Sequence, residues 1–315
     1  PPPSTSSGPG IGSSAAALRD RRTAAYTCPV TPPDAGAALS RRSLLQAIGL
    51  APLAAVFPLA AQTVAATPAA AATYTTITGR LTSAATGRKH NWTLTYPAGH
   101  GTGEHLPVAI VLHGSEQNAY TMLGLGYPGR LDALIAAGEA PAFALASIDG
   151  YNGYYERKGS RDYGKLVATE FLGLLAARGL DTSRLALTGW SMGGWGALRL
   201  AQHQLHGRVK VVTATSTPCY SSWKSQPAYV RSDQTKAQFT ANNFYHQPEL
   251  LRNLPIYLLC GTKDGFYKGN RAFAKVLGKA RGVRKPKTSF TSGSHSTKYW
   301  KSVVERQLRY IGTYL

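Results

Sequence analysis

The chain has 315 residues, of which 43% are hydrophobic and 10% aromatic, and its formal net charge is +20. This composition excludes collagen-like, coiled-coil and wholly disordered proteins, and the length allows at most about two domains. Residues 73–315 alone carry a net charge of +17, so the excess belongs to the part of the chain that can bury a core. A surface this basic attracts anionic partners, such as nucleic acid or an anionic cell envelope, or is simply solvated.

The N-terminal part has the composition of a segment that is not part of a folded domain. Residues 1–39 are rich in Pro, Ser, Gly, Ala and Thr without apolar periodicity, which predicts a disordered extension. Arg41 and Arg42 precede a moderately apolar run that ends in small residues at Ala72. This order predicts a Tat export signal at residues 40–72, read by the Tat translocase, and a secreted or envelope-associated protein of bacterial or archaeal origin. A membrane anchor is the alternative, but one glycine and two prolines interrupt the run.

Two cysteines, Cys219 and Cys260, remain after the predicted signal. A disulfide between them is permitted outside the cytoplasm, but we expect two buried free thiols. The sequence contains no CxxC motif and no histidine-rich spacing of the kind that binds metals. We therefore predict neither a metal site nor a cofactor.

From residue 73 onward, short apolar runs alternate with helix-like stretches. Several runs, such as Val108–Leu112, are apolar throughout, which indicates strands buried on both faces. The predicted strands are Tyr74–Leu81, Trp92–Tyr96, Val108–Leu112, Phe143–Ile148, Leu185–Thr188, Val209–Thr213, Ile256–Cys260 and Lys287–Thr291. The predicted helices lie near 119–137, 164–178, 192–205, 270–281 and 298–314. The alternation predicts one α/β domain over residues 73–315, with a mostly parallel eight-stranded sheet and helices on both faces.

The motif Gly-Trp-Ser-Met-Gly at residues 189–193 has the form G-x-S-x-G and lies between a predicted strand and a predicted helix. In that context, glycines on both sides of the serine allow a tight strand-to-helix turn that presents the hydroxyl at the edge of the sheet. The following helix N-terminus directs N–H groups at any negative charge that develops there. We therefore predict that Ser191 is a catalytic nucleophile.

A nucleophilic serine requires a base, and the base requires an acid that orients it, here in the chain order Ser, acid, His. The carboxylates between Ser191 and the last histidine are Asp233, Glu249 and Asp264. Asp264 follows the predicted strand Ile256–Cys260, where a parallel sheet delivers a catalytic acid, so we predict it as the acid. His295 is the only histidine after Asp264, and we predict it as the base.

Two backbone amides should form the oxyanion hole. One is that of Met192, directly after the nucleophile, and the other is expected from the loop after the strand Val108–Leu112. We assign the second to Ser115, because Gly114 lets the backbone turn close to the substrate. His113 precedes the nucleophile in the chain, and we predict that its ring hydrogen-bonds a neighbouring loop.

These residues carry a family resemblance. The stretches 112–114, 189–194, 260–264 and 293–296, with the Tyr-Trp pair at 299–300, resemble actinobacterial secreted α/β-hydrolases of the esterase D type. That group is similar to S-formylglutathione hydrolases and mycolyltransferases. The resemblance covers nearly all of residues 73–315 and implies an α/β-hydrolase fold and the same site roles. The mycolyltransferases place a Glu after the corresponding strand, where this chain has Asp264.

The substrate-binding side chains are less clearly marked. Tyr151, Tyr154 and Tyr155 follow the predicted strand Phe143–Ile148, so they could line an acyl or sugar pocket or serve ordinary packing. Trp223 belongs to an aromatic-rich stretch between two strands that is too short for a large cap domain, which favours an open site and a short acyl chain.

The sequence thus predicts a serine esterase that hydrolyses small-molecule or lipid esters through an acyl-enzyme. An acyltransferase that acts on cell-envelope lipids is the alternative with the same chemistry, and a peptidase also remains. A non-catalytic binding protein on a hydrolase scaffold is a third class, which the intact serine, acid and histidine set disfavours. Nucleic-acid binding has only the charge in its favour, because the sequence contains no helix-turn-helix, zinc-finger or aromatic RNA-binding signature.

Overall fold

The computed structural model describes residues 73–231 and 234–315. The predicted disordered extension and export signal, at residues 1–39 and 40–72, lie outside the described residues.

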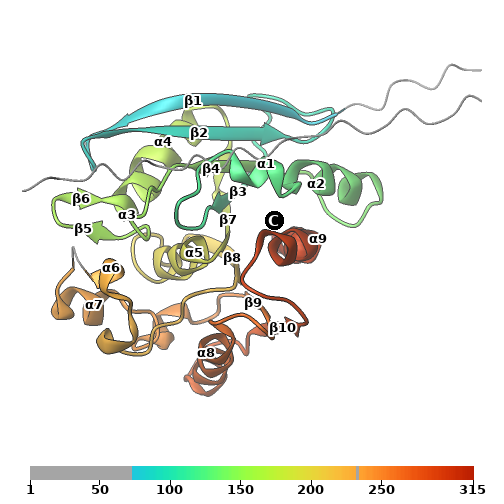
Figure 1. Ribbon diagram of the computed structural model, residues 1–315. Helices are drawn as coiled ribbons and strands as arrows, with labels where there is room; N and C mark the ends of the chain where they lie inside the picture. The colour runs from blue at the N-terminus through green and yellow to red at the C-terminus, as the bar shows by residue number, and fades with distance from the viewer. Residues whose placement is uncertain (1–72, 232–233) are drawn as a thin grey trace, which may run out of the picture. The chain divides into compact units, whose positions relative to one another are not determined.

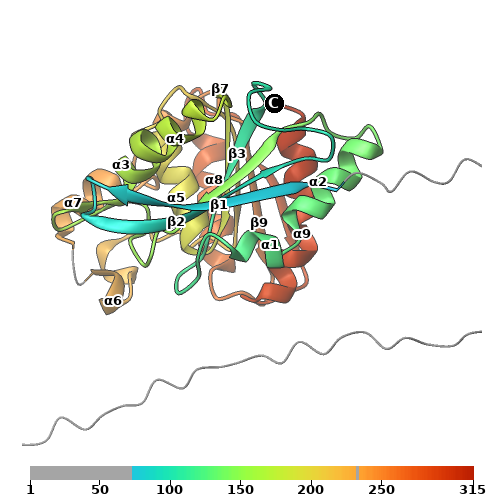
Figure 2. The ribbon, with the colours of Figure 1, turned by 90° about the horizontal axis from the view of Figure 1, so that it is seen from above.

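Eight strands form one sheet in the order β1-β2-β4-β3-β7-β8-β9-β10 (Figures 1 and 2). The strands of this sheet are β1 (Thr75–Ser83), β2 (Arg88–Tyr96), β3 (Pro107–Leu112), β4 (Ala144–Ile148), β7 (Asp181–Trp190), β8 (Val209–Thr215), β9 (Ile256–Gly261) and β10 (Lys287–Thr291). β2 pairs antiparallel with both β1 and β4, and every other pairing is parallel. The predicted mostly parallel eight-stranded sheet is therefore confirmed.

Helices cover both faces of this sheet. One face carries α1 (Thr121–Gly124), α2 (Tyr127–Ala136) and α9 (Thr297–Gly312). The other carries α3 (Tyr163–Lys165), the π-helical turn η1 (Leu166–Phe171), α4 (Leu172–Ala177), α5 (Met192–Gln202) and α8 (Tyr267–Lys279). Figure 1 shows α2 and α9 to the right of the central strands and α3 to α5 to their left.

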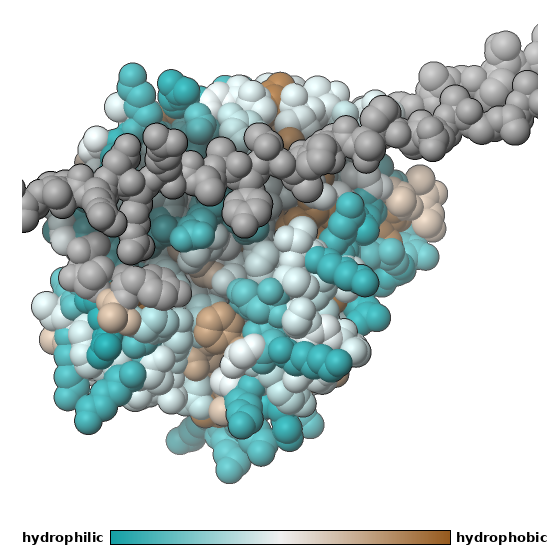
Figure 3. Space-filling model, in the orientation of Figure 1, coloured by the Kyte–Doolittle hydropathy of each residue, from teal (hydrophilic) through white to brown (hydrophobic). Residues whose placement is uncertain are grey.

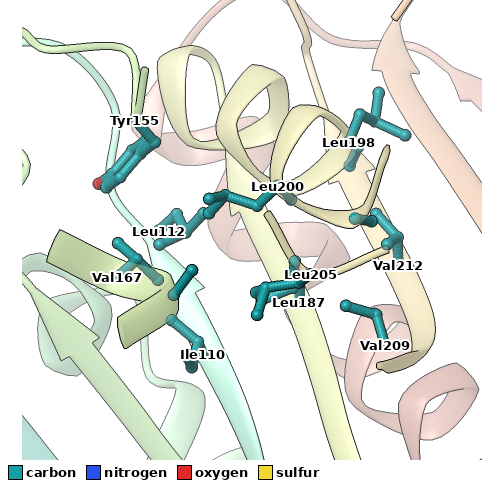
Figure 4. Packing of buried hydrophobic residues seen from close by; sticks show 14 of the residues in the cluster. Ile110, Leu112, Tyr155, Val167, Leu187, Leu198, Leu200, Leu205, Val209 and Val212 are labelled. Atoms are coloured by element: carbon teal, nitrogen blue, oxygen red, sulfur yellow. The ribbon is translucent and has the colours of Figure 1, made fainter. Parts of the chain in front are cut away.

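The central strands are apolar throughout because both of their faces are buried. In β3, Val108, Ile110 and Leu112 pack on the α5 side, whereas Ala109 and Val111 pack on the α9 side. Figure 4 shows the packing on the α5 side, around Ile110 and Leu112. Each fully buried aliphatic side chain contributes about 1.5–3 kcal/mol to the hydrophobic stabilisation, so two continuous cores hold the strand ends in place.

Some helix and strand boundaries differ from the predicted ones, because the pattern of apolar residues does not record a glycine turn or a polar strand segment. The predicted helix at 119–137 is divided into α1 and α2, because Gly126 adopts a left-handed backbone with φ of 80°. β7 begins at Asp181, four residues earlier than predicted. Its first four residues are polar and at least partly exposed, so the apolar pattern did not mark them as part of the strand. A short hairpin of β5 (Arg157–Lys158) and β6 (Arg161–Asp162) has no apolar pattern and was not predicted.

The stretch between β8 and β9 forms only short helices and no large cap domain within the described residues. These are the 3-10 turns η2 (Trp223–Ser225) and η3 (Pro248–Leu251) and the helices α6 (Ala228–Arg231) and α7 (Lys236–Asn242). Cys219 and Cys260 are both buried free thiols. In the described part of the chain, no helix has both the length and the apolar character needed to cross a membrane.

Candidate active site

Ser191 lies at the sharp turn between β7 and α5, with φ of 52° and ψ of −124°. A non-glycine residue in this conformation stores roughly 1–3 kcal/mol of strain, which the surrounding structure must offset. The flanking glycines explain how the turn fits. A Cβ on Gly193 would lie 1.9 Å from the Leu112 carbonyl oxygen, and one on Gly189 would lie 2.5 Å from the Gly193 carbonyl carbon. The G-x-S-x-G spacing is therefore required by backbone packing.

A continuous chain of hydrogen bonds joins three side chains from distant parts of the sequence. The Nε2 atom of His295 lies 3.0 Å from the Ser191 hydroxyl oxygen, and its Nδ1 atom lies 3.0 Å from an Asp264 carboxylate oxygen. The three residues follow the ends of β7, β9 and β10, which are parallel and lie along one edge of the sheet. This is the arrangement in which a histidine can remove the serine proton while a carboxylate orients the ring.

Asp264 is held as a carboxylate beneath the histidine. Its side chain is fully buried, and its second oxygen accepts a 2.8 Å hydrogen bond from the Phe266 amide. Burial raises the pKa of Asp264, but the hydrogen bonds from His295 and the Phe266 amide outweigh it and leave the pKa below its ordinary value. Of the other two candidate acids, Glu249 lies exposed in η3, and Asp233 lies outside the described residues.

Two aromatic rings fix the orientation of the His295 ring. Phe266 and Trp300 contact it edge-on, with ring centroids 5.1 Å and 5.0 Å from that of the imidazole. A third of the His295 side chain remains exposed. The imidazole is therefore restrained on its sides and open toward the side from which a substrate would approach.

In the loop after β3, the amides on both sides of Ser115 are used in hydrogen bonds. The Gly114 amide donates to the Gln117 side chain, and the Glu116 amide donates 2.8 Å to the Asn152 side chain. Within the described structure the Ser115 amide makes no hydrogen bond, and neither does the Met192 amide at the start of α5. Unpaired amides at a helix N-terminus and in an adjacent loop are the usual donors of an oxyanion hole.

His113 is buried behind this loop and does not face the site. Its Nε2 atom accepts a 2.8 Å hydrogen bond from the Gly150 amide, and its Nδ1 atom lies 2.7 Å from the Gly114 carbonyl oxygen. Burial lowers its pKa, so the ring stays neutral. The prediction that this ring hydrogen-bonds a neighbouring loop is confirmed.

A cavity of about 390 Å³ opens above Ser191. Its walls come from five segments of the chain and comprise Gly114, Ser115, Glu116, Asn152, Tyr154, Ser191, Phe266, His295 and Trp300. Sequence reasoning missed Asn152, Glu116 and Phe266. Their closeness in the chain to Tyr151, Ser115 and Asp264 was the only available signal.

The four aromatic residues predicted to bind substrate have different places. Tyr154 lines the cavity, and Tyr151 lines a neighbouring polar groove, where its hydroxyl donates to the Lys89 carbonyl oxygen. Tyr155 is fully buried and its hydroxyl accepts from the His113 amide, so it supports the loop and does not line the cavity. Trp223 packs on Phe239 at a ring distance of 5.8 Å and does not line the cavity either.

Comparison with known proteins places this geometry in a family. The model of the Esterase family, described as "Putative esterase", matches residues 83–311. A search of curated protein sequences gives no significant match.

Solved structures share the fold at low sequence identity. A ferulic acid esterase is 22% identical with a TM-score of 0.67, over 77% of this chain and 98% of that one. An S-formylglutathione hydrolase from Staphylococcus aureus is 16% identical with a TM-score of 0.62, over 76% and 98% of the two chains. Mycobacterium tuberculosis MPT51 is 16% identical with a TM-score of 0.57, over 75% and 97%. With its mostly parallel sheet and the serine at the β7–α5 turn, the chain belongs to the Esterase family and has the α/β-hydrolase fold.

Proposed function

We propose that this chain is a serine esterase that hydrolyses carboxylic esters through an acyl-enzyme, with Ser191 as nucleophile, His295 as base and Asp264 as orienting acid. The observation that carries the proposal is the hydrogen-bonded series from the Ser191 hydroxyl through both ring nitrogens of His295 to the Asp264 carboxylate. The strained backbone of Ser191 supports it, because such strain is retained mainly at functional sites.

The proposed reaction has two halves. His295 removes the Ser191 proton as the hydroxyl oxygen bonds to the ester carbonyl carbon, and the Met192 and Ser115 amides stabilise the resulting oxyanion. The C–O bond to the alcohol then breaks, and His295 gives its proton to the departing alkoxide. A water molecule, deprotonated by His295, hydrolyses the acyl-enzyme in the same way. Each oxyanion amide lowers the barrier by about 3 kcal/mol.

The cavity favours a short or aromatic acyl group. Its volume of about 390 Å³ is at the small end of ligand sites, and Tyr154, Phe266 and Trp300 supply flat apolar walls. The structural similarity to a ferulic acid esterase supports testing an aromatic ester beside the aliphatic ones.

The test is hydrolysis of p-nitrophenyl esters from acetate to palmitate, and of methyl ferulate, by the full chain and by Ser191→Ala. We expect cleavage of acetate, butyrate or ferulate and a loss of about 10⁴-fold or more in the variant. A folded chain that cleaves none of these esters, or an equally active Ser191→Ala variant, would refute the proposal.

Acyl transfer is the second candidate, and the exposure of His295 favours it. Because a third of this side chain is exposed, an alcohol can reach the acyl-enzyme in competition with water. Adding glycerol or a disaccharide as an acceptor alcohol during p-nitrophenyl ester cleavage distinguishes acyl transfer from hydrolysis. Transfer predicts a new ester by mass spectrometry, whereas hydrolysis yields free acid alone.

We also propose export of the protein by the Tat route, supported by Arg41 and Arg42 ahead of the apolar run. The test is expression of the full chain and of Arg41→Lys/Arg42→Lys in a bacterium with a Tat translocase. We expect export of the unaltered chain and retention of the variant inside the cell. Equal export of both would refute the Tat assignment.

A further inference from the structure

A groove between α8 and β10 concentrates positive charge outside the active site. It has a volume of about 350 Å³ and is lined by four cationic side chains, those of Arg271, Lys275, Lys279 and Lys285. The other lining residues are Ala274, Gly278, Pro286, Thr288 and Phe290. Figure 3 shows hydrophilic residues over the lower end of the molecule, where Figure 1 places α8.

The charge of this groove is not neutralised by the protein. The sequence has ten basic residues and no acidic residue between positions 265 and 304. All four groove cations are exposed, and within the described residues none of them forms an ion pair with a carboxylate. Four uncompensated charges around one hollow repel each other, so binding an anion there relieves a cost that the free protein carries.

The cations follow the long axis of α8. Arg271, Lys275 and Lys279 are four residues apart, so they form a row with steps of about 6 Å along one face of the helix. Lys285 faces this row from the segment that leads into β10. A row of this kind matches a linear partner with repeated negative charges better than a single small anion.

The apolar and aromatic content of the surface disfavours two other anionic partners, a membrane and single-stranded nucleic acid. The large exposed hydrophobic side chains of the described structure are Tyr74, Tyr120 and Tyr151, and none belongs to α8 or β10. A membrane-docking surface would need such side chains to insert. Phe290 is the only aromatic residue of the groove, and its ring already packs against Tyr267 at 5.6 Å. Single-stranded nucleic acid would require free aromatic rings for base stacking.

The groove ends beside the active-site loops. α8 begins three residues after Asp264, and β10 ends four residues before His295. Tyr267, the first residue of α8, packs edge-on against Phe290 of β10, with ring centroids 5.6 Å apart. The same two elements, α8 and β10, therefore line the groove and adjoin the loops that carry Asp264 and His295.

From these observations we propose that the α8–β10 groove binds a linear, flexible polymer of phosphate groups and holds the protein on it. This binding does not depend on the proposed esterase activity. It requires only the row of cations on α8 and Lys285 opposite to it.

The test is binding of fluorescently labelled long-chain inorganic polyphosphate to the full chain, followed by anisotropy at several salt concentrations. The double variant Lys275→Ala/Lys279→Ala removes two groove cations and retains good helix-forming residues. The control Lys224→Ala/Lys236→Ala removes the same charge from exposed sites on η2 and α7. Circular dichroism and thermal unfolding establish that both variants are folded.

We expect saturable binding by the unaltered chain and by the control. For the groove variant we expect affinity lower by on the order of tenfold, with a salt slope less steep by about 2. Equal losses in the two double variants would overturn the proposal, because only the total charge would then matter. Tighter binding to oligothymidylate or to vesicles of phosphatidylglycerol than to polyphosphate would also overturn it, in favour of nucleic acid or a membrane surface.

Discussion

The indole N–H of Trp190 donates a 2.6 Å hydrogen bond to the side-chain oxygen of Gln117, which also accepts from the Gly114 amide at 3.1 Å. Trp190 directly precedes Ser191, and Gln117 belongs to the loop that contains Ser115. One side-chain oxygen thus fixes the distance between the two segments whose amides we assign to the oxyanion hole.

Gln117→Met keeps the length of the side chain and removes the acceptor. We expect kcat to fall by about 10–100-fold with little change in KM, because the Ser115 amide shifts relative to Ser191 and loses contact mainly with the transition state. Steady-state kinetics on p-nitrophenyl acetate measure both constants. A rise in KM at constant kcat would mean that Gln117 contributes to substrate binding instead.

Asp264→Asn tests the choice of acid. The neutral amide of Asn cannot stabilise a protonated His295 ring, and its N–H group can donate to Nδ1 and favour the wrong tautomer, so we expect kcat to fall about 10³–10⁴-fold at unchanged fold stability. Glu249→Gln is the matched control, since this exposed carboxylate should be removable without loss of activity. Full activity in Asp264→Asn would assign the role of the acid to another residue.

Gly193→Ala tests the packing of the nucleophile turn. The new methyl group would lie 1.9 Å from the Leu112 carbonyl oxygen, which belongs to a central strand and cannot move freely. We expect the free energy of unfolding to drop by about 1–3 kcal/mol, together with a loss of activity. In Gly173→Ala the methyl group meets no atom within 4 Å on helix α4, so that variant should be more stable by about 1 kcal/mol. Denaturant unfolding of both variants provides the comparison.

His203 makes stability depend on pH. Burial and the nearby Arg199 lower the pKa of His203 to about 4, whereas an unfolded chain has its ordinary value near 6.5. The unfolded state therefore binds more protons between pH 6.5 and 4, and stability falls as the pH is lowered through this window. His203→Gln should reduce this fall by about 1 kcal/mol, or roughly 2–4 °C in Tm.

Thermal unfolding at pH 7 and at pH 4.5 gives the comparison for His203. The two proteins should differ in how far Tm drops between these pH values, with the smaller drop in the variant. An identical drop in both proteins would place the acid sensitivity elsewhere.

Several features of the fold could be read directly from the chain. All eight strands of the main sheet were predicted, and central ones such as β3 were marked most clearly, because a strand buried on both faces needs apolar residues at every position. The shortfalls were at polar strand ends, as in β7, and in the β5–β6 hairpin, which has no apolar residue to mark it. Gly126 divides a helix that apolar spacing alone makes continuous.

Ser191, Asp264 and His295 could be singled out from the sequence by itself. The serine turn is a local motif whose glycines are required by backbone contacts, and acidic residues and histidines are so scarce after it that order and position left few choices. Only the tertiary structure decided which side chains form the cavity and which support it. Tyr154 and Tyr155 are neighbours with the same chemistry, yet one lines the cavity and the other is buried beneath His113. That difference depends on packing between segments far apart in the chain, which no local pattern of residues records.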